Sequence, residues 1–143
     1  MQSEKQFCTF FLKDLFFGVE VINVQEVLKY QEMTRVPLSD EVIKGLINLR
    51  GQIVTAIDLR RKLDIEPLSA DKLPMNVVLK TESGAVSLLV DEIGDVLEVS
   101  EESFELPPET LQGNIRELVN GVYKLKDQLL LSLNTEKAVN VCT

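Results

Sequence analysis

Short alternations of hydrophobic and polar residues run along almost the whole chain and predict β-strands. The runs are rich in β-branched and aromatic residues and are separated by turn residues, which is typical of half-buried strands. They are Phe7–Leu12, Phe16–Val21, Met33–Val36, Gly45–Arg50, Gln52–Leu59, Asn76–Thr81, Ala85–Val90, Ile93–Val99, Leu118–Leu125 and Gln128–Leu133. The pattern therefore predicts a mainly β protein of about ten strands.

Helical patterns are confined to short segments. The spacing of Val24, Val27 and Leu28 predicts a helix over Asn23–Lys29, whose apolar face either packs on a core or lines a groove. Further short helical segments are expected at a turn that begins at Ser39 or Asp40, over Arg60–Leu63, and in a C-terminal segment capped by Asn134 or Thr135.

The chain also repeats itself. Phe7–Leu28 aligns without a gap with Asn76–Leu97, which matches Val24 with Ile93, and Gly45–Asp58 aligns with Gly121–Asn134. Closing strands into a barrel removes exposed edges, and five strands in about 65 residues suit an SH3-like barrel. We expect two side-by-side five-stranded SH3-like β-barrels with short helices, formed by residues 1–66 and 67–143 and linked by Asp64–Pro74. The segment Glu136–Thr143 is not assigned to one barrel.

Charge and hydropathy argue against several partners. The chain carries 23 acidic and 15 basic residues, and this net charge of −8 disfavours binding to nucleic acid or to anionic membrane surfaces. No apolar stretch approaches the roughly 20 residues of a membrane-spanning helix, so no direct membrane insertion is expected. The N-terminal residues lack the apolar region of a signal peptide, which predicts a cytoplasmic protein.

Candidate catalytic and metal-binding chemistry is sparse. The chain has no histidine, which removes the usual general base and a common metal ligand and so excludes most familiar catalytic designs; no metal and no cofactor are expected. Cys8 and Cys142 form no metal-binding motif and are expected to be reduced thiols. A pair of carboxylates such as Asp91 and Asp95 is the remaining catalytic alternative.

An ordered set of motifs carries a resemblance to a known family. The segments "VINVQEVL", "TRVP", "IKGLINLRGQIVTAIDLR", "VSLLVDEIGDVLEV" and "LPPE" together resemble the CheW-like domain family of bacterial chemotaxis. This family includes coupling proteins, the regulatory end of the histidine kinase CheA and the N-terminal part of CheV. The similarity runs from about Phe7 to Val139, and no receiver or kinase module fits beside it in 143 residues, which favours a free-standing coupling protein.

The resemblance implies a function as well as a fold. It implies an adaptor, without catalysis, that couples the cytoplasmic tips of chemoreceptors to the regulatory domain of CheA and is recruited to receptor arrays at the membrane. The acidic second half, with strand edges in Asn76–Val99, is the expected contact for CheA. The alternative is a related adaptor of a twitching or surface-sensing array, or another β-barrel module that binds a peptide or helix.

The resemblance also implies which residues matter. The receptor-binding residues are expected to be Val24, Glu26, Val27, Arg50, Val77, Val86, Ser87 and Ile93. Gly45, Gly51 and Asp58 are expected to be structural, with Asp58 capping a helix that carries solvated Arg60 and Arg61. Arg50 has no candidate base or nucleophile near it in sequence, and Gly51 can account for the turn, so Arg50 is expected to be a contact residue.

Overall fold

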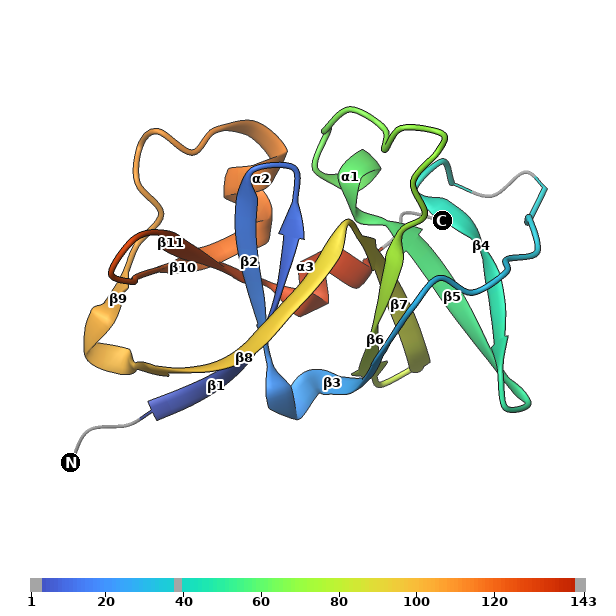
Figure 1. Cartoon of the computed structure of the whole chain (residues 1–143), viewed down its shortest axis with the longest axis horizontal. Coiled ribbons are helices and arrows are strands. Elements are labelled where there is room, and N and C mark those ends of the chain that lie inside the picture. The colour runs from blue at the N-terminus through green and yellow to red at the C-terminus, as the bar shows by residue number, and fades with distance from the viewer. Residues whose placement is uncertain (1–3, 38–39, 141–143) are drawn as a thin grey trace.

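The computed structural model describes residues 4–37 and 40–140, in which β-strands predominate (Figure 1). The strands are β1 (Glu4–Leu12), β2 (Leu15–Glu20), β3 (Val24–Leu28), β4 (Ile43–Leu49), β5 (Gln52–Asp58), β6 (Met75–Thr81), β7 (Gly84–Val90), β8 (Glu92–Ser100), β9 (Phe104–Glu105), β10 (Val119–Lys124) and β11 (Leu129–Leu133). The helices are all short: η1 (Val21–Asn23), α1 (Leu59–Lys62), η2 (Glu101–Ser103), α2 (Gly113–Leu118) and α3 (Thr135–Val139). The prediction of a mainly β fold with short helices is confirmed.

The predicted helix over Asn23–Lys29 is wrong, because most of this segment is strand β3. Its side chains alternate between half-buried and exposed, and the strand pairs with β6 through a bulge between Val24 and Glu26. The helical spacing of three apolar residues was misleading, since a five-residue segment rich in valine can satisfy either period. The backbone pairing with β6 stabilises Val24–Leu28 as an extended strand.

Other predicted segments fit to different degrees. Met33–Val36 forms only one bridge, between Thr34 and Leu46, rather than a strand. A turn begins at Asp40, whose carboxylate accepts a hydrogen bond from the N–H of Val42, whereas Ser39 lies outside the described residues. The C-terminal helix is confirmed, with Asn134 as its cap. Strand β9 and helix α2 were not predicted.

The strands form two sheets that do not follow the predicted division at residue 66. Sheet A has six strands in the order β8-β1-β2-β11-β10-β9, and sheet B has five in the order β3-β6-β7-β5-β4. Each sheet therefore takes strands from both halves of the chain. The prediction of residues 1–66 and 67–143 as separate barrels has to be corrected in this respect. Each sheet forms one barrel-like unit, and both halves of the chain contribute strands to each unit.

The internal repeat explains this exchange. Strands β6, β7 and β8 are the repeats of β1, β2 and β3, while β10 and β11 are the repeats of β4 and β5. The two sheets have the same order under this correspondence, but the third strand of each triplet crosses over: β3 pairs with β6, and β8 pairs with β1. Figure 1 shows β8 running across the molecule to reach β1.

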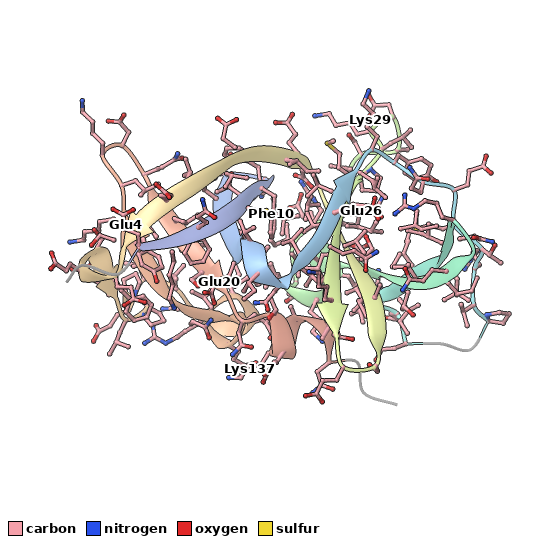
Figure 2. All side chains as sticks on the ribbon, turned by 90° about the horizontal axis from the view of Figure 1, so that it is seen from below. Glu4, Phe10, Glu20, Glu26, Lys29 and Lys137 are labelled. Atoms are coloured by element: carbon pink, nitrogen blue, oxygen red, sulfur yellow. The ribbon has the colours of Figure 1, made fainter. Side chains whose placement is uncertain are left out.

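A shared hydrophobic core joins the two sheets. Its largest cluster contains Phe10 and Phe17 from sheet A together with Ile57 and Leu88 from sheet B, all with at most 1% of their surface exposed. Figure 2 shows Phe10 between the strands of the two units. Smaller clusters fill each unit separately, and burial of this kind stabilises by about 25 cal/mol per Å² of apolar surface. The two units are therefore expected to fold together.

Gly45 has its predicted structural role, although it lies in a strand and not in a turn. A Cβ atom at Gly45 would stand 2.8 Å from the carbonyl oxygen of Thr34, which crosses β4 at the bridge to Leu46. The repeat places Gly121 at the equivalent position of β10, where a Cβ atom would stand 2.3 Å from the ring of Phe104 in β9. Both glycines let another segment approach the strand closely.

Candidate protein-binding site

Strand β3 lies at one edge of sheet B and presents two different sides. Val24, Glu26 and Leu28 are half-buried, whereas Gln25 and Val27 are exposed. Val24 packs against the core shared by the two sheets, and Val27 keeps 40% of its surface exposed. The two valines predicted to bind the receptor thus differ: Val27 is exposed enough to meet a partner, whereas Val24 packs against the shared core.

The tip of the β4–β5 hairpin is a tight two-residue turn. Arg50 and Gly51 have φ angles of 50° and 86°, the sign that a type I′ turn requires at both central positions. The side chain of Asn48 accepts a hydrogen bond from the N–H of Gly51 at 3.0 Å. The sequence suggested that Gly51 alone could account for the turn. In the structure Arg50 also adopts the left-handed conformation, so both residues form the turn.

An ion pair brings Glu26 and Arg50 together. A guanidinium nitrogen of Arg50 donates to the carboxylate of Glu26, while Gln25 donates to Gln52 at 3.4 Å. Strand β3 is one edge of sheet B, and the β4–β5 hairpin lies at the other end of the sheet, so these contacts show that the sheet curls until β3 meets the tip of that hairpin. The hydrogen bond from Arg50 lowers the pKa of Glu26 below its ordinary value. We call Gln25, Glu26, Val27, Arg50, Gln52 and Ile53 the β3–turn surface.

Three members of the β3–turn surface, Gln25, Gln52 and Ile53, were missed as functional candidates by sequence reasoning. Gln52 meets Gln25 across the curled sheet, and Ile53 is 59% exposed beside it. Only the closure of the sheet brings Gln52 to β3, and no local pattern in the sequence reports that closure. The exposure of Ile53 could have been predicted, because successive side chains in a strand point to opposite faces and its neighbour Val54 is buried.

Ile93 occupies the position in sheet A that matches Val24 in sheet B. Both side chains are half-buried against the shared core, as the repeat suggested. Their neighbours Val27 and Val96 are matched as well, and Val96 keeps 58% of its surface exposed on β8. Each sheet therefore has an edge strand with one apolar residue facing inward and another facing outward.

Besides Val24 and Ile93, three more predicted receptor-binding residues do not belong to the β3–turn surface. Val77 is 1% exposed and Ser87 is fully buried, so neither can touch a partner in this conformation. The hydroxyl of Ser87 donates to the side chain of Asn76 at 2.7 Å, and Asn76 in turn donates to the backbone of Lys29. Val86 is half-buried and lines a hollow beside α3 together with Val139. Both strands are interior in sheet B, and runs of consecutive residues in them are buried, which shows that both of their faces are covered.

Asp58 caps α1, as predicted, but its two arginine neighbours differ. The carboxylate of Asp58 accepts from the N–H of Arg61, and the side chain of Arg61 makes an exposed ion pair with Glu41 at 2.8 Å. Arg60 is not solvated, because its Nε and Nη2 atoms donate to Asp91 at 2.7 and 2.5 Å and only 13% of its side chain is exposed. The expectation of a solvated Arg60 is therefore wrong.

The ion pair between Arg60 and Asp91 connects the two units. Asp91 lies between β7 and β8 and also accepts a hydrogen bond at 2.7 Å from the N–H of Lys13, in the β1–β2 turn of sheet A. Burial by itself raises the pKa of Asp91, but the hydrogen bonds from Arg60 and Lys13 outweigh it and hold that pKa below its ordinary value. The carboxylate of Asp91 therefore has a structural role. The backbone carbonyl of Asp95 accepts a hydrogen bond from the hydroxyl of Thr9.

Other candidate chemistry is limited to a few groups. Burial raises the pKa of the Cys8 thiol, which is the free cysteine within residues 4–37 and 40–140; Cys142 lies outside them. Over the same ranges, no group of three or more cysteine, aspartate and glutamate side chains is arranged to hold a metal ion. A membrane-crossing helix is absent from the described segments, whose helices are too short for that role.

Comparison with known proteins agrees with the fold and the motifs. The chain is 32% identical to the chemotaxis protein CheW of Klebsiella aerogenes over 136 residues, covering 95% of this chain and 82% of that protein. It is 26% identical to the chemotaxis protein CheW of Thermotoga maritima, covering 98% and 91%. The crystal structure of the scaffolding protein TtCheW from Thermoanaerobacter tengcongensis superposes with a TM-score of 0.82 at 28% identity, covering 92% and 89%. Residues 6–142 match the CheW-like domain model, and the chain belongs to this family.

Proposed function

We propose that this chain is a chemotaxis scaffold that couples chemoreceptor tips to the regulatory domain of the histidine kinase CheA. The observation that carries the proposal is the family match, which extends over residues 6–142 and so includes both units. The names of the relatives favour chemotaxis over the twitching or surface-sensing alternative. The scaffold is recruited to the membrane through the receptors that it binds.

The receptor contact in this proposal is the β3–turn surface. A receptor tip is a helical hairpin, and helices dock through spaced apolar anchors flanked by polar groups. Val27 and Ile53 supply exposed apolar surface. Arg50 supplies a planar guanidinium group that can form paired hydrogen bonds, and 69% of its side chain is exposed. Val24 packs against the shared core beside this surface, whereas Ile93 lies in β8 of sheet A and is left out of the contact. Val77 and Ser87 are left out of the contact because they are buried.

The kinase contact in this proposal is the free edge of β8. Within the segment Asn76–Val99, strands β6 and β7 are interior, so only β8 leaves an edge open for a partner. The residues of β8 beyond Ile93 include exposed Asp95, Val96 and Glu98, which give that edge a negative charge. An exposed edge can accept a further strand or side-chain contacts from a similar domain.

Calorimetric titration tests the proposed function. The folded chain should bind a soluble chemoreceptor-tip fragment and, separately, the isolated regulatory domain of CheA. A double variant with Asp95→Lys and Glu98→Lys should bind the kinase domain at least tenfold more weakly and the receptor tip normally, since only the β8 edge is recharged. A native chain that binds neither partner refutes the proposal, and a recharged chain with native kinase affinity refutes the β8 assignment.

A further inference from the structure

A pocket lies under the link between the two halves, and no residue of β3 or β8 lines it. It is enclosed by the link residues Pro67–Pro74, the end of β7, the start of α1, the segment after β3 and one residue of β4. Its volume is about 250 Å³. A cavity of about 150 Å³ is enough for benzene, so this link pocket can take one ring with a short side chain.

The link pocket has an apolar floor. Leu89 and Val90, at the end of β7, are 4% and 1% exposed and form its base. Met33, Leu68 and Pro74 are half-buried in its walls, and Tyr30 adds an aromatic ring. Ligand pockets commonly combine such apolar walls with a few polar groups that orient the ligand. The apolar body of a ligand would be desolvated here.

Basic side chains outnumber acidic ones around the link pocket, since Lys44, Arg60 and Lys72 line it against Asp58 and Asp91. Two carboxylates line it, but Asp91 is held by Arg60 and Asp58 caps α1. Lys44 and Lys72 also line it, and within the described residues neither ammonium group forms an ion pair. Lys72 does lie in the field of Asp91. Both lysines are exposed, so each can turn toward a ligand.

We infer that the link pocket binds a small organic anion, specifically a carboxylate carried by a single aromatic ring. The ring would occupy the floor over Leu89 and Val90, and the carboxylate would lie between Lys44 and Lys72. Hydrogen bonds to a charged group are stronger than neutral ones, so the carboxylate should dominate selectivity. This site shares no residue with the proposed receptor and kinase contacts, and it would give the scaffold a small-molecule input beside the Arg60–Asp91 ion pair that connects its two units.

Titration of the ¹⁵N-labelled chain with phenylacetate tests this inference, with phenylacetamide as the neutral ligand of the same shape. Phenylacetate should give saturable amide shifts at residues around the link pocket, and phenylacetamide should bind at least fivefold more weakly. Lys44→Gln and Lys72→Gln should each weaken phenylacetate binding about fivefold. Lys80→Gln, which changes an exposed lysine of β6 outside the pocket, should leave it unchanged.

Three results would overturn the inference. The first is the absence of saturable shifts at the pocket. The second is equal affinity for the acid and the amide, which would show an apolar hollow without anion recognition. The third is native phenylacetate affinity in both lysine variants, each of which should keep the native spectrum outside the pocket because only exposed side chains are changed.

Discussion

At the scale of single residues, Arg50 combines a backbone role and a side-chain role that substitutions can separate. Its φ of 50° lies in the left-handed region, which costs a non-glycine residue roughly 1 kcal/mol or more. Arg50→Gly should therefore unfold at higher denaturant than Arg50→Ala, by about 1 kcal/mol in free energy, although both lack the side chain. Equal stability of the two variants in urea titration would contradict the left-handed turn.

The side chain of Arg50 is expected to matter for binding more than for stability. Arg50→Ala should weaken receptor-tip binding about ten- to hundredfold because it removes charge-assisted hydrogen bonds, and Arg50→Lys should lose only part of this. Kinase binding should persist in both variants. Arg61→Ala is the control, since it removes an exposed arginine that is also ion-paired. Native tip affinity in Arg50→Ala, measured by calorimetry, would remove Arg50 from the receptor contact.

At the scale of elements, the two sides of β3 should respond differently to the same substitution. Val24→Asp places a charge against the shared core and should lower the free energy of unfolding by about 2 kcal/mol or more. Val27→Asp changes an exposed side chain and should alter stability by less than about 0.5 kcal/mol while weakening receptor binding. Thermal unfolding and tip titration measure both effects. A stable Val24→Asp variant would contradict the packing of this strand.

Helix α1 should help to hold the units together through Arg60 and Asp91. Arg60→Met leaves the Asp91 carboxylate partly buried without its partner and should lower the free energy of unfolding at pH 7 by about 3 kcal/mol. Arg61→Met, the matched change to an exposed pair, should have an effect below about 0.5 kcal/mol.

The same pair predicts a pH dependence with a defined sign. Because the pKa of Asp91 is lowered in the folded protein, its stabilisation is present above the unfolded value of about 3.9 and is lost as pH falls through the folded value. The stability difference between the native chain and Arg60→Met should therefore shrink below about pH 4. A difference that stays constant between pH 7 and pH 3 in urea titrations would show that Arg60 acts through packing alone.

At the scale of the whole molecule, the repeat could be predicted from the sequence but the exchange of strands could not. The alignment of Val24 with Ile93 and of Gly45 with Gly121 predicts equivalent positions, and the structure has both pairs in matching environments. Which half supplies the partner of β3 depends on contacts far apart in the chain, and local periodicity carries no information about them. For the same reason the contacts between Glu26 and Arg50 and between Arg60 and Asp91 were not predicted.

The shared core also affects how the scaffold can work. Residues of both sheets pack in one cluster, so the β3–turn surface and the β8 edge are parts of a single folded body. A scaffold needs two surfaces that can be occupied together, and a common core holds the two surfaces in a fixed relation.

Kinase affinity in the presence of the receptor tip tests this account most directly. The regulatory domain of CheA would be titrated calorimetrically into the chain alone and into the chain saturated with a receptor-tip fragment. Separate surfaces predict that both partners bind at once, with a kinase affinity that changes less than about threefold. Displacement of the tip by the kinase domain, or loss of kinase binding when the tip is bound, would contradict a scaffold that joins the two.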